Sequence, residues 1–208
     1  MRVAVFIDGG FLKEKYRFYH QGRFPTAEDV LTIRDQVISS EPLRNFSLFR
    51  VYYYDCEPYE GTIEHPVTKE VVDISDTPSA RAQRHFLRTL RSKERMAVRI
   101  GELVYKGWKI DSRALQRLSE GDEASISGTD LIPDLNQKQV DIKMGLDIAW
   151  MAQKRIVEAF ALVAGDSDLV PALKFARQEG ILTFLAPLGH SLRFDLIEHS
   201  DGLIETFI

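Results

Sequence analysis

Two short, uninterrupted apolar segments place the strongest constraint on how this chain can fold. Val3–Ile7 reads VAVFI, Ala159–Ala164 reads AFALVA, and an acidic turn follows each of them. A strand that is apolar at every position must be buried on both faces, which is typical of a parallel sheet covered by helices. Because helical and strand-like segments alternate along the chain, we expect βαβ units with right-handed crossovers. The sequence therefore predicts an α/β protein with a mainly parallel central sheet.

Local patterns predict the remaining elements. After Val3–Ile7 the sequence Asp-Gly-Gly predicts a turn. Further strands are expected at 46–54, 96–105, 181–187 and 203–208, and helices at 27–39, 77–94, 140–154, 168–180 and 191–198. Two segments lack a sustained period. Residues 56–79 are expected to form a loop with a small hairpin near 69–74, and the polar segment 107–137 is a candidate mobile flap.

Composition narrows the class of protein. A length of 208 residues predicts a single domain spanning 1–208, with insertions near 56–79 and 107–137. The single cysteine, Cys56, excludes an internal disulfide and a cysteine-rich zinc site, and it favours a reducing, cytoplasmic location. No apolar run approaches the ~20 residues that span a bilayer, so no membrane partner is expected. The net charge of −4 argues against coating nucleic acid through bulk charge.

Acidic residues follow both apolar strands. Asp8 ends the first strand, and Asp166 and Asp168 follow the second one in the turn Gly-Asp-Ser-Asp. Ligands of open parallel sheets bind beyond the carboxyl ends of the strands, so neighbouring strands would bring these carboxylates together. Unpaired carboxylates in one place repel each other, and a hard divalent cation removes that cost. We therefore expect a Mg²⁺ or Mn²⁺ site. A turn residue at Asp8 and a helix N-cap at Ser167 or Asp168 are the structural alternatives.

The predicted helix at 140–154 carries two more acids. Asp141 lies where the helix should begin, so an N-cap is its structural alternative. Asp147 lies inside the helix, four residues after Lys143 and on the same face. An exposed ion pair between Lys143 and Asp147 is one interpretation. The other places Asp147 at the rim of the metal site and Lys143 near a substrate phosphate.

The motifs AVFIDGG, KQVDIKMGLDIAW and ALVAGDSDLVPALKFARQEGILTFL, in this order, resemble the NYN domain of the LabA-like group in the PIN-like nuclease superfamily. The resemblance runs from Met1 to about Phe207. It implies a three-layer α/β/α sandwich and a metal-dependent ribonuclease acting on RNA. The implied metal ligands are Asp8, Asp141, Asp147, Asp166 and Asp168. All of these except Asp141 are also expected to be catalytic, and Ser167 would orient a water or phosphate.

One position departs from the family pattern. The family commonly has asparagine three residues after the first aspartate, where this chain has Phe11. A polar support for Asp8 or for the substrate is therefore missing, which leaves a non-catalytic RNA-binding or regulatory module as the main alternative. A haloacid-dehalogenase-type phosphatase is a weaker alternative. Such an enzyme needs a second aspartate at the position of Gly10.

A basic helix is the last candidate for RNA contact. Five arginines between 81 and 95 recur within about an 80° arc of one helix face, which predicts contact with phosphates. Arg84, Arg88 and Arg91 are the expected substrate-binding residues of this set. Solvent exposure or pairing within the fold is the alternative. The histidines show no metal-ligand spacing, and the sequence leaves open whether the chain forms a homo-oligomer.

Overall fold

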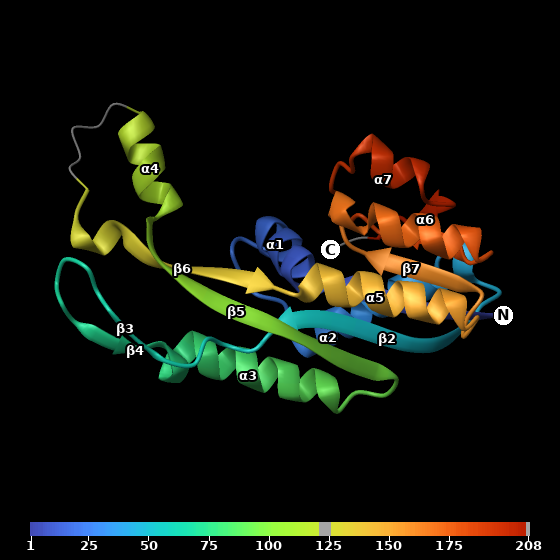
Figure 1. The fold of residues 1–208 in the computed structure, drawn as a ribbon, viewed down its shortest axis with the longest axis horizontal. Coiled ribbons are helices and arrows are strands. Elements are labelled where there is room, and N and C mark those ends of the chain that lie inside the picture. Colours follow the sequence, from blue (N-terminus) through green and yellow to red (C-terminus); the bar gives the residue numbers. More distant parts are fainter. Residues whose placement is uncertain (121–125, 207–208) are drawn as a thin grey trace.

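The computed structural model describes residues 1–120 and 126–206. Its core is a seven-stranded sheet with the order β6-β5-β2-β1-β7-β8-β9 (Figure 1). The strands are β1 (Arg2–Asp8), β2 (Ser47–Cys56), β5 (Met96–Ile110), β6 (Leu131–Lys138), β7 (Ala159–Val163), β8 (Leu182–Leu185) and β9 (Gly202–Leu203). Every neighbouring pair is parallel except β5 and β6. This architecture confirms the predicted α/β class with a mainly parallel sheet.

Helices cover both faces of the sheet, as the three-layer prediction requires. Buried side chains of α1 (Gly9–Tyr19), α2 (Ala27–Ser39) and α3 (Pro78–Arg91) share one hydrophobic core with the sheet. On the other face, α5 (Val140–Gln153), α6 (Val170–Gln178) and α7 (Phe194–Glu198) form a second core. Strands β1 and β7 are buried along nearly their whole length, because they lie in the middle of the sheet between these two cores.

Helix α1 differs from the prediction of a turn after the first strand. The backbone turns at Asp8, whose carboxylate accepts hydrogen bonds from the amides of Gly10 and Phe11 and so caps the helix. Leu12 and Tyr16 are then buried one turn apart. Glycine is a poor helix former, so the two glycines at the start of α1 favoured a turn over a helix in the sequence prediction.

The segment 107–137 also differs from the prediction of a flap. Strand β5 continues to Ile110, α4 (Ser112–Ser119) follows, and β6 returns antiparallel to β5. Together they form an arm, defined as residues 103–120 and 126–137, that projects from the sheet edge (Figure 1). The prediction failed here because both strands of the ladder are only half-buried, so apolar and polar side chains are mixed along them. Backbone hydrogen bonds hold the two strands together, and such bonds leave no apolar pattern in the sequence by which a strand could be recognised. The centre of the predicted flap, 121–125, lies outside the described residues.

The smaller elements follow the predictions only in part, and residues 207–208 of the predicted last strand lie outside the described residues. Strands β3 (Thr62–Glu64) and β4 (Val71–Asp73) form an antiparallel hairpin within the predicted loop 56–79. Helix α7 and strand β9 are shorter than expected. No helix in the described part of the chain is both long and apolar enough to cross a bilayer. The division of the chain into a single domain stays a prediction.

Candidate active site

Asp8 lies at the carboxyl end of β1, in the centre of the sheet. Its backbone turn is possible because Gly9 has no side chain. A Cβ at Gly9 would lie 2.6 Å from the Tyr53 hydroxyl oxygen and 2.7 Å from the backbone oxygen of Tyr54. The close approach of β2 therefore fixes the point at which β1 ends and α1 begins. The carboxylate of Asp8 is held there by the amides of Gly10 at 2.8 Å and Phe11 at 3.1 Å.

The pKa of Asp8 is raised to about 6, chiefly because burial penalises the charged carboxylate. The two backbone hydrogen bonds oppose this effect, whereas the negative charges of Asp141 and Asp55 add to it. Two other acids therefore act on Asp8, and Asp8 itself forms no ion pair within the described residues. Asp8 is the most perturbed aspartate at this edge of the sheet.

Asp141 interacts electrostatically with Asp8 and with the acids of the turn after β7, and the four residues Asp8, Asp141, Asp166 and Asp168 are together called the four-acid cluster. Asp141 lies in the first turn of α5, and its pKa is raised by burial and by the charges of Asp166 and Asp168. Asp166 caps the short 3₁₀ turn Ser167–Leu169 and accepts from the amide of Asp168 at 2.9 Å. Within the described residues, none of the four acids forms an ion pair with a lysine, arginine or histidine.

The four carboxylates provide the hard oxygen donors that Mg²⁺ and Mn²⁺ prefer. Their mutual repulsion would be relieved by a cation. However, no group of three acidic, histidine or cysteine side chains in residues 1–120 and 126–206 is arranged so that it could hold an ion. The donor chemistry thus fits a divalent cation that keeps several of its waters, rather than one enclosed by protein ligands.

Asp147 is not part of this cluster. Its carboxylate accepts from the Tyr54 hydroxyl at 2.8 Å and from Nε of Arg99 at 3.0 Å. Burial of Tyr54, with the charge of Asp147, raises the pKa of the hydroxyl, so it stays protonated and donates. Asp147 therefore has two partners of its own, and neither is Lys143. A metal-binding role for Asp147 stays a prediction that this arrangement does not favour.

The residues predicted to bind substrate do not share one environment in the structure. Lys143 donates to the backbone oxygen of Ile100 at 2.7 Å, so its ammonium group is already engaged. Ser167 lies in the turn between Asp166 and Asp168 and is half-buried.

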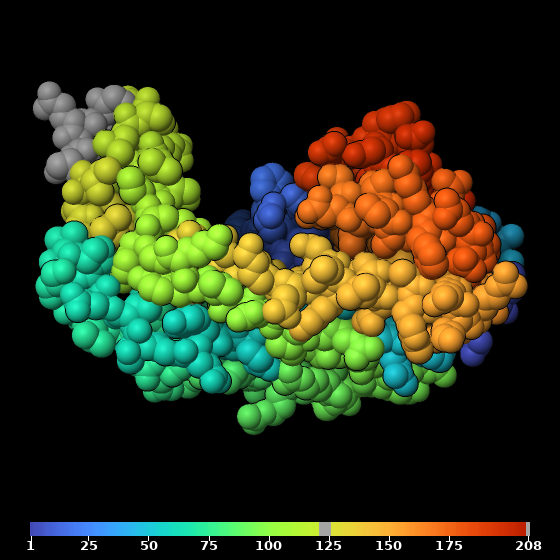
Figure 2. Space-filling model, viewed as in Figure 1, coloured from blue at the N-terminus to red at the C-terminus, as the bar shows by residue number. Residues whose placement is uncertain are grey.

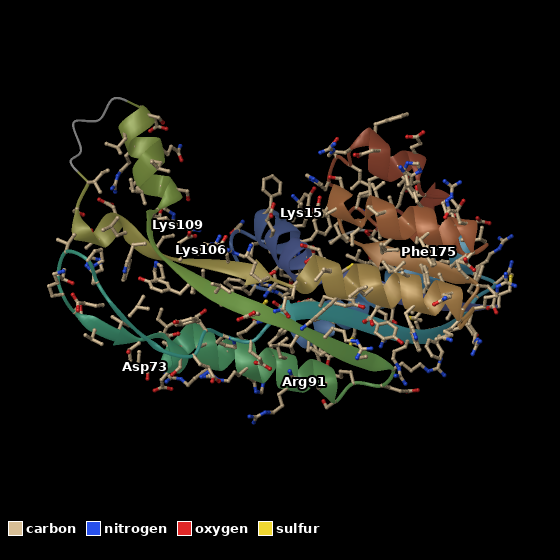
Figure 3. The ribbon with its side chains drawn as sticks, in the orientation of Figure 1. Lys15, Asp73, Arg91, Lys106, Lys109 and Phe175 are labelled. Atoms are coloured by element: carbon tan, nitrogen blue, oxygen red, sulfur yellow. The ribbon has the colours of Figure 1, made fainter. Side chains whose placement is uncertain are left out.

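On α3, Arg84 donates to the backbone oxygen of Ser75, and Arg91 pairs with Glu57 at 2.6 Å. Arg88 is exposed. Figure 3 shows Arg91 on the lower side of the molecule, away from the carboxyl edge of the sheet. Arg91 thus lies apart from the four-acid cluster, and Arg84 and Arg91 are both engaged within the fold.

Asp55 is a site residue that the sequence prediction missed. It is the penultimate residue of β2, directly after Tyr54, which is the register partner of Asp8. It is only 1% exposed and forms an ion pair with Lys13 at 2.8 Å. Gln83 and the Tyr53 hydroxyl also donate to it. The available signal was an acid at the end of the apolar segment VYYYDC, the same pattern that identified Asp8 and Asp166.

A groove leads away from the four-acid cluster. It has a volume of about 600 Å³, begins at Asp141 and Asp168, and continues between α5 and α6 past Leu146 and Phe175. Figure 2 shows a wider hollow between the arm and the α6–α7 region, with α1 between them. The cluster is therefore open to a large ligand from the carboxyl edge of the sheet.

A mostly parallel sheet between two helix layers, with acids at its carboxyl edge, is an α/β architecture consistent with the PIN-like fold. The model of the NYN domain family matches residues 72–205, and the chain belongs to this family. The matched range includes the acids of α5 and of the turn after β7, and it begins after Asp8 and Asp55. Neither the curated proteins nor the solved structures yielded a significant match.

Proposed function

We propose that this protein is a metal-dependent ribonuclease that hydrolyses RNA phosphodiester bonds at the four-acid cluster. The observation that carries the proposal is the electrostatic interaction of Asp141 with Asp8 on one side and with Asp166 and Asp168 on the other, with no ion pair to any of the four among the described residues. Membership of the NYN family supports a nuclease, because this family is grouped with the PIN-like ribonucleases. Both lines of support concern the same edge of the sheet.

The four acids would together coordinate Mg²⁺ or Mn²⁺, some of them directly and some through waters bound to the ion. When bound, the metal supplies a polarised phosphoryl oxygen and a water of lowered pKa. Asp8 is held in place by two backbone amides, so its carboxylate needs little reorganisation. Asp166 is fixed in the same way by the amide of Asp168. Ser167, in the turn between these acids, would orient a water or a phosphate oxygen.

Cationic side chains around the hollow support RNA as the substrate. Figure 3 shows Lys106 and Lys109 on the arm beside the hollow, and Lys15 on α1. Lys109 is paired with Asp134 at 2.9 Å, and Lys106 is exposed. Lys15 is paired with Glu14 at 3.0 Å, so a phosphate backbone that enters the hollow would meet chiefly the exposed charge of Lys106 before it reaches the acids. A cytoplasmic location and a homo-oligomeric state stay predictions.

A non-catalytic RNA-binding module is the second candidate. Two observations favour it. Phe11 stands where the family commonly has asparagine, and no three acidic, histidine or cysteine side chains among the described residues are arranged to hold a metal ion directly. Such a module would bind RNA and release no product.

Asp166→Asn separates the two candidates, because the amide keeps the volume of the side chain but not its charge. We expect purified wild-type protein to cleave a mixed RNA pool with Mn²⁺ or Mg²⁺ and to lose this activity in EDTA. Asp166→Asn should reduce cleavage by at least about a hundredfold while its thermal melt stays close to that of wild type. Asp35→Asn, at an exposed position of α2, is the matched control. RNA binding without metal-dependent product in the wild type would support the binding module instead.

A further inference from the structure

A second pocket lies on the other side of Gln137 from the groove between α5 and α6. It has a volume of about 220 Å³ and is lined by residues of α1, β5, β6, the start of α3 and the segment after β2. Pockets for drug-sized ligands measure roughly 300–1,000 Å³, so this one suits a smaller fragment. Neither the four-acid cluster nor the proposed metal uses it.

The polar groups of this pocket converge on the buried carboxylate of Asp55. Lys13 pairs with Asp55, and this neutralises the charge. The side-chain amide of Gln83 donates to Asp55 at 3.1 Å and to the backbone oxygen of Cys56 at 3.2 Å. Both amide hydrogens of Gln83 are thereby used, so its oxygen is the group that it can offer to a ligand. The pocket is thus nearly neutral and has hydrogen-bonding groups at fixed positions.

The remaining walls of the pocket are apolar or aromatic. Tyr59 is half-buried and lies with its ring centre 6.0 Å from that of Tyr105. Phe24 is 59% exposed, although it lines the same pocket, and Leu103 and Leu135 form part of the opposite wall. Apolar walls with a few convergent polar groups favour a flat, uncharged ligand that makes directional hydrogen bonds.

Gln137 connects this pocket to the four-acid cluster. Its side chain lines both the pocket and the groove that begins at Asp141 and Asp168. A Cβ at Gly10 would lie 3.1 Å from the Gln137 side-chain oxygen and 3.3 Å from the Asp8 carboxylate. The pocket and the acids are therefore separated by about the width of one side chain. This spacing is compatible with a base in the pocket and its neighbouring phosphate at the acids.

We propose that this pocket, at the base of the arm, binds one unpaired nucleobase of the RNA strand whose phosphate reaches the four acids. The inference rests on the proposed function, because that function identifies the bound strand as RNA. A phosphate would not suit the pocket, because Lys13 is already neutralised by Asp55. A splayed-out base fits, since single-stranded RNA is read by stacking on aromatic side chains and by hydrogen bonds to base edges. A base inside a duplex could not enter.

The test uses Asp166→Asn protein without metal, so that binding is measured apart from cleavage. The probes are the four common nucleoside 5′-monophosphates, with ribose 5-phosphate as the probe that lacks a base. Binding is followed by chemical-shift changes of the backbone amides. We expect at least one monophosphate to shift the amides around Cys56, Gln83 and Gln137, and ribose 5-phosphate to leave them unchanged.

Two further substitutions in this background test the pocket itself. Gln83→Leu should weaken binding of the preferred monophosphate by about tenfold, because a buried base edge loses its partner. Phe24→Ala changes an exposed side chain, so it tests the same pocket without risk to the fold. Gln178→Leu, at an exposed position of α6, is the matched control and should leave binding of the monophosphate unchanged.

Three outcomes would overturn the proposal. They are equal shifts with ribose 5-phosphate, no shifts around the pocket with any monophosphate, and undiminished binding in both Gln83→Leu and Phe24→Ala. Each can occur whether or not the wild type cleaves RNA, so failure of this inference is distinct from failure of the proposed ribonuclease.

Discussion

The ring of Phe11 lies directly against Gly165, so that α1 contacts the turn that carries Asp166 and Asp168. A Cβ at Gly165 would lie 2.5 Å from ring carbon Cε2 of Phe11 and 3.2 Å from Cδ2 of His190. The rings of Phe11 and His190 also meet edge to face, 5.8 Å between centres. Phe11, which stands where the family commonly has asparagine, thus supports the acidic turn by packing.

Gly165→Ala should therefore destabilise the protein by about 1–3 kcal/mol, because the added methyl group overlaps the ring of Phe11. The same substitution in a Phe11→Ala background should cost much less, since the obstruction is gone. Chemical denaturation of the four proteins in this cycle measures the coupling. Gly145→Ala is the control. Gly145 lies inside α5, and a Cβ there would be 3.7 Å from the Cβ of Ala172, so this substitution should be neutral or stabilising by up to about 1 kcal/mol. If the losses in the free energy of unfolding caused by Gly165→Ala and by Phe11→Ala simply add in the double variant, the contact is contradicted.

Asp8→Asn should stabilise the metal-free protein at neutral pH. The folded-state pKa of about 6 lies above the ordinary value of 3.8, so between about pH 4 and 6 the folded protein holds a proton that the unfolded chain has released. The free energy of unfolding therefore falls as pH rises through this window. Asparagine keeps the helix cap but carries no charge. We expect a gain on the order of 2 kcal/mol at pH 7 and a flatter pH profile.

Denaturation in EDTA at several pH values between 4 and 7.5 measures this effect. Asp35→Asn is the control, and its curve should stay within about 0.5 kcal/mol of the wild type. If Asp8→Asn and wild type run parallel over the whole range, the burial of Asp8 carries no electrostatic cost and this prediction is wrong.

Asp147→Ala should act on stability and leave metal affinity unchanged. Tyr54 is only 1% exposed, and the substitution removes the acceptor of its hydroxyl as well as the partner of Arg99. An unsatisfied buried hydroxyl costs about 1–3 kcal/mol. Mn²⁺ titration beside chemical denaturation checks both effects, with Asp141→Ala as the comparison that should lose affinity. Weaker Mn²⁺ binding at unchanged stability would instead place Asp147 in the metal site, as the sequence resemblance implies.

Replacement of Arg84, Arg88 and Arg91 by glutamine separates the two roles that the sequence leaves open for α3. Since Arg84 and Arg91 are engaged within the fold, we expect a lower melting temperature and an unchanged dependence of RNA affinity on salt. If an arginine did bind a phosphate of a single strand, its removal would flatten the slope of log K against log salt by about 0.7. RNA binding at several salt concentrations beside a thermal melt decides the question. A slope flattened by about 2 would assign these arginines to RNA.

The strand-end acids were predictable because their signal is local. An apolar segment followed by an acid identifies both the end of a buried strand and the side chain beyond it, and this holds at Asp8, Asp166 and Asp168. The same rule applies at Asp55. There the apolar segment predicts a strand that ends at Tyr54, whereas β2 continues to Cys56 and includes the acid.

The class of the fold follows from the sequence, because apolar runs and helical periods record which faces of each element must leave water. Which acids meet depends on the tertiary structure. Asp141 joins Asp166 and Asp168 because α5 begins beside the turn after β7, whereas Asp147 is paired with Arg99, 48 residues earlier on β5. The strand order that places β5, β2, β1 and β7 side by side sets these distances. Electrostatic partners depend on distance in space rather than on spacing along the chain, so no local pattern could reveal them.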